Sequence, residues 1–344
     1  MKILHVAESV QGGCGTYLNE MLPLQSASLG SAQVRCIAPR QHLAQLHRLQ
    51  PGQLLPFERP GRAQGLPGLA RAVWQAVRDW QPDLVHAHST FAGAVVRGLS
   101  LLRPMPPVVY CPHGWVFDVE LPAAARGLTK LAERWMSHRC ARIVAISEHE
   151  LQQGLEAGIR ARRMALVRNG VSPLLTDEVA PWPDDRLRLL FVGRLDRQKG
   201  ADILLQAVAP LQAQVCVRIV GERVHAGTGA RLPQMAHVGY TGWLSQQQVA
   251  AQINACDAVV MPSRWEGFGL VAVEAMRAGK PVLASAVGGL REIVVDGLTG
   301  HLFPPDDAPA LGSLLAGLDR PTLQRMGADG LDRFLAHYTS GRTH

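Results

Sequence analysis

Two glutamates stand eight positions apart in a stretch where an apolar run, a glycine-rich turn and a helix are expected to follow one another. The apolar run at 258–262 is typical of a buried parallel strand. Glu266 lies in the turn, and Glu274 lies in the helix expected at 270–278, which Gly279 ends. Free N–H groups at the start of that helix favour an anion, and a carboxylate one turn further on suits the two hydroxyls of a ribose. The stretch therefore predicts a pocket for a sugar nucleotide.

A second stretch, VGRLDRQKG at 192–200, places two cations just after another expected strand. Transfer from a sugar nucleotide expels a nucleoside diphosphate, so negative charge builds up on the diphosphate oxygens. Many transferases neutralise this charge with a divalent ion held by a D-x-D motif, which this sequence lacks. Arg194 can hold two phosphate oxygens as a fork, and Lys199 adds a point charge. We therefore expect this pair to act in place of a metal ion.

Three histidines come at the ends of expected strands in the first half of the chain. Ligands of doubly wound sheets bind beyond the carboxyl ends of the strands, which favours a functional role for His113, in CPHGW. That role is to contact a donor sugar or to respond to charge, and His113 need not be a general base. His86 and His88 suggest a metal pair, but we expect their side chains to point to opposite faces of the strand. We therefore interpret them as structural and predict no metal site.

The elements that must position these residues alternate between strand and helix, which predicts an α/β fold with doubly wound parallel sheets. The length of 344 residues favours two domains. Three prolines and four acids at 172–185 are typical of a linker. We predict an N-terminal domain at 1–172, a linker at 173–186, a C-terminal domain at 187–325 and a short helix or tail at 326–344. The strands are expected at 2–7, 33–38, 83–87, 108–111, 142–146, 164–167, 187–192, 215–220 and 258–262.

The positive charge of the chain is concentrated in its first half. Residues 1–172 hold 19 Lys and Arg against 11 Asp and Glu, whereas the remainder is nearly balanced. A helix expected within 121–142 has an apolar stripe that includes Leu128 and Trp135 beside a basic face that includes Lys130. A solvated basic face is the ordinary interpretation, and a peripheral contact with an anionic membrane is the alternative. Nucleic acid is disfavoured because no binding motif or aromatic interleaving accompanies the charge.

Two further absences bear on where the protein works. No window has the roughly 18 consecutive apolar residues of a membrane-spanning helix, and the start of the chain lacks the apolar core of a signal peptide. The six cysteines show no C-x-x-C spacing. We therefore expect reduced cysteines in a cytoplasmic protein, with a place at the inner face of the cell membrane left open.

Five motifs in register resemble the retaining glycosyltransferases of family 4, which have the two-domain GT-B fold. The motifs are ISE at 146–148, NGV at 169–171, VGRLDRQKG at 192–200, the two glutamates eight apart, and VGGLREIVVDGLTG at 287–300. The resemblance covers about residues 1–307 and is strongest in the second half. The resemblance implies that the first domain binds the acceptor and the second binds the donor, a UDP-sugar or GDP-sugar, with no metal cofactor. It also implies that the segment at 221–236 is shortened, which leaves base contacts near 221–223 and 239–244 unassigned.

The resemblance assigns roles to residues that local pattern alone leaves open. The glycine turn at 11–15 fails the dinucleotide spacing because Leu18 replaces the third glycine, yet the family's matching glycines let the backbone approach the diphosphate. The implied catalytic residues are His113, Arg194, Lys199 and Glu266. The implied donor-binding residues are Gly12, Gly13, Arg194, Lys199, Glu266, Gly267, Phe268, Gly269, Leu270 and Glu274.

The function that these expectations favour is transfer of a hexose, with retained configuration, to a glycan or lipid-linked acceptor in bacterial surface polysaccharide synthesis. The implied reaction is a front-face displacement in which a leaving phosphate oxygen accepts the proton of the acceptor. Three alternatives stay open: a glycosidase with paired carboxylates, a sugar-nucleotide epimerase of related fold, and a non-catalytic subunit that binds sugar nucleotides.

Overall fold

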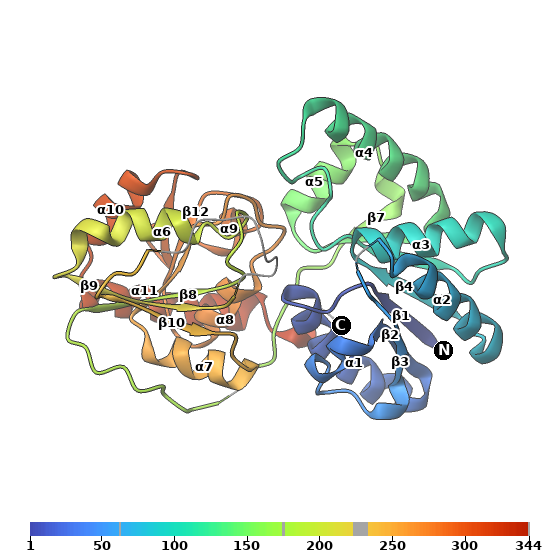
Figure 1. Cartoon of the computed structure of the whole chain (residues 1–344), viewed down its shortest axis with the longest axis horizontal. Helices are drawn as coiled ribbons and strands as arrows, with labels where there is room; N and C mark the ends of the chain where they lie inside the picture. Colours follow the sequence, from blue (N-terminus) through green and yellow to red (C-terminus); the bar gives the residue numbers. More distant parts are fainter. Residues whose placement is uncertain (62, 174–175, 223–232, 343–344) are drawn as a thin grey trace. The chain divides into compact units, whose positions relative to one another are not determined.

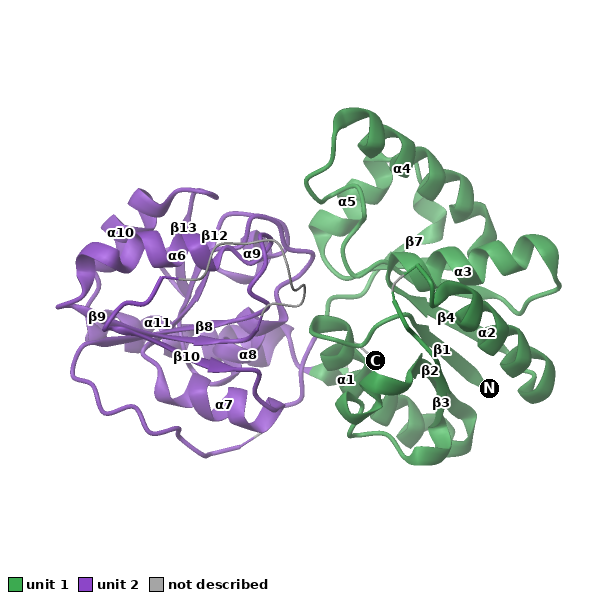
Figure 2. Ribbon diagram, viewed as in Figure 1, with its two compact units in different colours: residues 1–169, 340–344 green, residues 170–339 purple. Residues whose placement is uncertain are grey.

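The computed structural model of the chain describes residues 1–61, 63–173, 176–222 and 233–342. They form two compact units, which Figure 2 shows in separate colours. Unit 1 comprises Met1–Asn169 with Ser340–His344, and unit 2 comprises Gly170–Thr339. The stretch whose composition is typical of a linker thus belongs to unit 2, where Trp182 stacks under the guanidinium of Arg218 at 4.2 Å.

The described residues of unit 1 form a seven-stranded parallel sheet in the order β3-β2-β1-β4-β5-β6-β7 (Figure 1). The chain builds outward from β1 to β3 and then continues on the other side of β1, so the order reverses between β1 and β4. The strands are β1 (Ile3–Ala7), β2 (Val34–Pro39), β3 (Leu54–Phe57), β4 (Leu84–His88), β5 (Val108–Cys111), β6 (Arg142–Ala145) and β7 (Met164–Leu166). The helices are α1 (Gly13–Leu29), α2 (Leu66–Trp80), α3 (Ser89–Leu102), α4 (Ala123–Met136) and α5 (Glu148–Glu156).

The described residues of unit 2 form a six-stranded parallel sheet with the same kind of reversal, in the order β10-β9-β8-β11-β12-β13. Here the order reverses between β8 and β11, and doubly wound sheets bind their ligands beyond the carboxyl ends of strands at such a point. The strands are β8 (Leu187–Val192), β9 (Val215–Val220), β10 (Val238–Gly242), β11 (Ala258–Met261), β12 (Val282–Ser285) and β13 (Gly300–Phe303). The helices are α6 (Ala201–Val208), α7 (Gln246–Ala255), α8 (Leu270–Arg277), α9 (Leu290–Ile293), α10 (Ala308–Ala316) and α11 (Arg320–His337).

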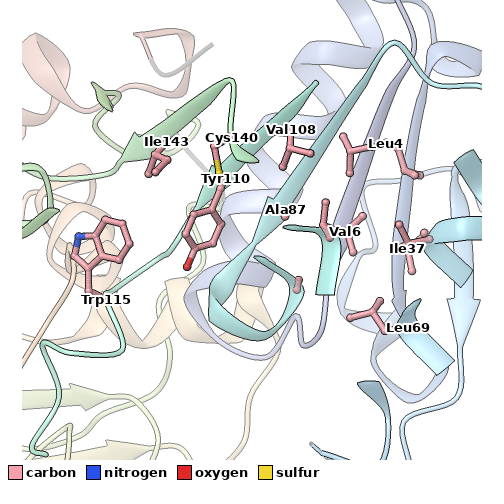
Figure 3. Packing of buried hydrophobic residues seen from close by; sticks show 14 of the residues in the cluster. Leu4, Val6, Ile37, Leu69, Ala87, Val108, Tyr110, Trp115, Cys140 and Ile143 are labelled. Atoms are coloured by element: carbon pink, nitrogen blue, oxygen red, sulfur yellow. The ribbon is translucent and has the colours of Figure 1, made fainter. Parts of the chain in front are cut away.

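The core of unit 1 shows how strand periodicity separates apolar from polar side chains. Leu4 and Val6 of β1 pack with Ala87 of β4 in one buried cluster (Figure 3). Because successive side chains of a strand point to opposite faces, His5 lies on the other side of the sheet. There its Nε2 lies 2.7 Å from Oε1 of Gln25, on α1. The face of β1 that α1 covers therefore carries a buried imidazole.

The predicted fold class is confirmed, and the strands expected from apolar runs coincide with observed ones to within one or two residues. Four strands had no expectation, namely β3, β10, β12 and β13. The first helix begins at Gly13, within the glycine turn at 11–15. At the other end α11 packs on α8, and Ser340–Arg342 then contact α1 within unit 1.

Two expectations about the whole chain can be compared with the structure. All six cysteines are free, and five of them are buried. Within the described residues, no helix combines the length and the apolar character that crossing a membrane requires.

Candidate active site

The two loops at the point of reversal in unit 2 meet through Lys199 and Glu266. Gly200 has φ 66°, and a Cβ there would lie 2.0 Å from the carbonyl oxygen of Pro262. Only glycine permits this approach, which brings the loop after β8 against the loop after β11. Nζ of Lys199 forms an ion pair with the carboxylate of Glu266, and the two side chains are 19% and 11% exposed. The sequence predicted both residues as functional but did not predict that they pair.

Arg194 lies in the same loop and is held by two neighbours that the sequence analysis did not single out. Its guanidinium pairs with Asp196 at 2.9 Å and donates to Oε1 of Gln198 at 2.6 Å. Asp196 also accepts the backbone N–H of Lys199 at 3.1 Å, so one carboxylate organises both cations. Gln198 in turn donates to the carbonyl of Trp265 at 3.1 Å, which ties the two loops together. Side chains of this polar loop form the network, so hydrophobic periodicity carried no signal for it.

The second glutamate lies where the sequence placed it, in helix α8. Gly269, with φ 109°, precedes the helix, and Phe268 is buried with its ring edge-on to Tyr338 at 6.1 Å. Glu274 is 8% exposed and lines a small pocket of about 10 Å³, too small for more than one water. Glu266 thus lies in the loop before α8 and Glu274 lies in α8 itself. The small pocket beside Glu274 has no room for a nucleotide.

In unit 1, the loop after β5 holds His113 in a conformation that few residues adopt. His113 has φ 53°, and Gly114 follows with φ 102°. The carboxylate of Glu150 on α5 accepts N–H bonds from Gly114 at 2.6 Å and Ile146 at 2.7 Å. Burial raises the pKa of Glu150 to about 7, although these two N–H groups favour its charged form. Glu150 is thus a positioning residue for the His113 loop, and its place near the ISE motif is the only signal that the sequence offered.

The expectation that His86 and His88 point to opposite faces is wrong. They are two residues apart on β4, and side chains of a strand repeat with a period of two, so both rings lie on one face. Their centroids are 4.2 Å apart, and the ring of His5 on β1 lies 5.2 Å from each. Nδ1 of His5 lies 2.9 Å from Nε2 of His88, and Nδ1 of His88 lies 3.1 Å from Nε2 of His113. The structure therefore joins His113 to a cluster of histidines.

Burial keeps these imidazoles uncharged. It lowers the pKa of His5 and of His113 to about 4, and it lowers the pKa of His86 and His88 well below the usual value. At neutral pH each ring therefore has one N–H donor and one lone pair. His113 can offer a ligand a neutral hydrogen-bonding group, and it lacks the basicity of an ordinary histidine.

Comparisons with known proteins find a matching family model for each half of the chain. The model described as Glycosyltransferase Family 4 matches residues 12–173, and the model described as Glycosyl transferases group 1 matches residues 176–327. A protein of the cps region of Klebsiella pneumoniae is 31% identical over 322 residues, covering 90% of this chain and 87% of that protein. The D-inositol 3-phosphate glycosyltransferase of Streptomyces scabiei is 30% identical, covering 92% and 81%. The chain belongs to glycosyltransferase family 4.

Solved structures agree with this membership at the level of the fold. Anabaena HepE in complex with UDP-glucose matches with a TM-score of 0.81 and 22% identity, covering 100% of this chain and 97% of that one. Sucrose-phosphate synthase of Thermosynechococcus elongatus matches with a TM-score of 0.79 and 22% identity, covering 100% and 96%. The glycosyltransferase therefore has the GT-B fold that its motifs predicted.

The sites predicted from sequence fall on both units of this glycosyltransferase. Unit 2 brings together Arg194, Lys199 and Glu266, with 267–270 leading into α8. Unit 1 carries His113 and the exposed turn glycines Gly12 and Gly13, which lie at the start of α1. Of the positions left open for contacts to the base, 223 lies outside the described residues, as does the part of the shortened segment at 224–232.

Proposed function

We propose that this glycosyltransferase is a retaining hexosyltransferase that moves a hexose from a nucleoside-diphosphate sugar to a glycan or lipid-linked acceptor. The observation that carries the proposal is the cluster of Arg194, Lys199 and Glu266 at the reversal point of unit 2. Two half-buried cations fit a diphosphate, and each charge-assisted hydrogen bond contributes about 1.5–3 kcal/mol. The relative from the Klebsiella cps region supports surface polysaccharide synthesis as the pathway. The complex of HepE with UDP-glucose supports a nucleoside-diphosphate sugar as the donor.

The proposed mechanism needs no metal ion at the diphosphate. Arg194 and Lys199 stabilise the charge that develops as the bond from the sugar to the diphosphate breaks. The acceptor hydroxyl attacks from the same face, and a departing phosphate oxygen takes its proton. Glu266 orients Lys199 and lies beside the hydroxyls of the sugar, and Glu274 takes those of the ribose. The family resemblance assigns His113 of unit 1 to the sugar, and its ring nitrogen that does not bond to His88 is the neutral hydrogen-bonding group it offers. The family resemblance assigns approach to the diphosphate to the backbone at Gly12 and Gly13 of unit 1.

A donor screen tests this function directly. The intact protein is incubated with UDP-glucose or GDP-mannose in buffer without Mg²⁺ or Mn²⁺, with and without a lipid-diphosphate-linked sugar or short glycans. We expect release of the nucleoside diphosphate to depend on an acceptor, and the new glycosidic linkage to keep the anomeric configuration of the donor. Equal release without an acceptor contradicts transfer and indicates an epimerase or hydrolase. Binding without any release indicates a non-catalytic subunit.

The acceptor is proposed to lie at a membrane surface, because helix α4 of unit 1 turns an apolar stripe outward. Leu128, Leu131 and Trp135 are 70%, 61% and 60% exposed, and Arg126 and Arg134 beside them are exposed as well. An anionic bilayer complements both features, since the stripe enters the headgroup region while the cations bind lipid charge. Each cation close to such a surface contributes about 1 kcal/mol. We therefore propose a reversible, peripheral contact with the inner face of the cell membrane.

Vesicle flotation tests this contact. We expect the protein to float with vesicles that contain phosphatidylglycerol at low salt and to stay behind with neutral phosphatidylcholine vesicles. The pair Leu131→Ser and Trp135→Ser should lower the fraction bound by about tenfold or more, since it removes much of the inserting apolar area. Leu298→Ser, at a leucine of unit 2 that is 50% exposed, is the matched control and should float normally. The proposed membrane contact is contradicted if wild type floats equally with both kinds of vesicle, or if it floats with neither kind at low salt.

A further inference from the structure

The face of the unit 1 sheet beneath α1 holds three buried histidines that no step of the proposed reaction uses. They are His5 on β1 and His86 and His88 on β4, and their exposed fractions are 0%, 8% and 0%. One ring nitrogen from each lies within 4.8 Å of a ring nitrogen of each of the others. From this convergence we propose that the three imidazoles form a binding site for one transition-metal ion of the zinc class.

The hydrogen bonds to Gln25 and His113, outside the cluster, allow two lone pairs of the cluster to converge. The amide oxygen of Gln25 only accepts, so Nε2 of His5 carries the proton and Nδ1 of His5 presents a lone pair. When Nδ1 of His88 donates to Nε2 of His113, Nε2 of His88 presents a second lone pair. In the protein without metal, Nδ1 of His5 and Nε2 of His88 lie 2.9 Å apart and share one hydrogen bond, which an ion bound by both lone pairs would replace. Histidines that bind metals almost always donate their other N–H to an outer partner, and Gln25 and His113 occupy those two positions.

His86 provides an independent observation. Its Nε2 is buried and has no hydrogen-bond partner, and a buried nitrogen without a partner costs free energy. The ring lies 4.2 Å from that of His88, so a metal ion held by the other two histidines would lie within reach of His86. Such an ion would supply the interaction that this side chain lacks in the protein alone.

The chemistry of the donor set decides the class of ion. Three neutral imidazoles suit Zn²⁺, Co²⁺, Ni²⁺ or Cu²⁺, whereas Mg²⁺ and Ca²⁺ prefer oxygen ligands. Zinc–nitrogen bonds of about 2.0–2.1 Å in a tetrahedron place ligand nitrogens about 3.3 Å apart, which small rotations of these side chains allow. The fourth position is left for water or another small ligand. The ion would also fix the ring of His88 and, through it, that of His113.

Titration with Co²⁺ tests the site by spectroscopy. The full-length protein is stripped of metal and titrated with Co²⁺, which shows visible d–d bands of tetrahedral intensity when imidazoles bind it. We expect one Co²⁺ per chain, bands without the near-ultraviolet absorption of a thiolate, and displacement by Zn²⁺. His86→Gln should weaken the affinity by at least about 100-fold, since even changes to outer partners cost about 10- to 100-fold. Gln25→Leu keeps all three ligands and should weaken it by about 10- to 100-fold.

The control is His42→Gln, because His42 is also buried in unit 1 with an unpartnered ring nitrogen but lies outside the cluster. It should bind Co²⁺ as wild type does. Thermal unfolding in the absence of metal shows whether each variant is folded, and Gln25→Leu remains informative if His86→Gln is not. The proposal is overturned if wild type binds no stoichiometric Co²⁺ or Zn²⁺, or if folded His86→Gln or Gln25→Leu binds them as tightly as wild type.

Discussion

Lys199→Ala is expected to lower kcat by about 10²–10³-fold, a loss of about 2.7–4 kcal/mol in transition-state stabilisation. The side chain is only 19% exposed and pairs with Glu266, so its charge is less screened by water than that of a surface lysine. In the proposed reaction that charge faces the diphosphate as the sugar departs. Turnover is measured by release of the nucleoside diphosphate from the donor and acceptor that wild type uses.

Arg194→Ala is expected to act in the same direction, because Arg194 shares the Asp196 carboxylate with the backbone of Lys199. The double variant should lose less than the product of the single losses, since residues in one network are not independent. Arg197→Ala provides the matched control, as it is an exposed arginine in the same loop and should retain wild-type turnover. Turnover within threefold of wild type in folded Lys199→Ala contradicts the assigned role.

Arg97→Ala is expected to lower the free energy of unfolding by about 3–5 kcal/mol, because it leaves a buried carboxylate without its partner. Arg97 on α3 is fully buried and forms two hydrogen bonds with Glu133 on α4, at 2.6 and 3.1 Å. Its guanidinium also lies 4.0 Å from the centroid of Tyr110 on β5. Urea unfolding followed by circular dichroism measures the loss.

The double variant Arg97→Met with Glu133→Leu distinguishes a lost ion pair from lost packing. Apolar residues of similar volume often replace a buried pair without loss, so most of the stability should return. Arg78→Ala is the control, because Arg78 and Asp79 form an exposed pair on α2 and its unfolding should match wild type. If Arg97→Ala unfolds within 1 kcal/mol of wild type, or the double variant is as unstable as the single one, the account is wrong.

The same ion pair explains why α4 differs from an ordinary amphipathic helix. Periodicity located the stripe of Leu128, Leu131 and Trp135, and such a stripe normally faces a core. In the structure the buried contact of α4 is made by Glu133, and the stripe is exposed. The hydrophobic pattern reveals that a helix has an apolar face and a polar face. Whether each face is buried against the protein or exposed to solvent depends on tertiary packing.

The sequence alone predicted the chemistry that its local motifs would carry. Apolar runs followed by glycine turns predicted most of the strands, the start of α8 and the place of the cations just after β8, because strand, turn and helix signals depend on neighbours in the chain. Only the tertiary structure decided that Lys199 pairs with Glu266, 67 residues away, and that His5 joins His86 and His88. Those contacts follow from strand order, which places β8 beside β11 and β1 beside β4, and no periodicity encodes which distant strands become neighbours.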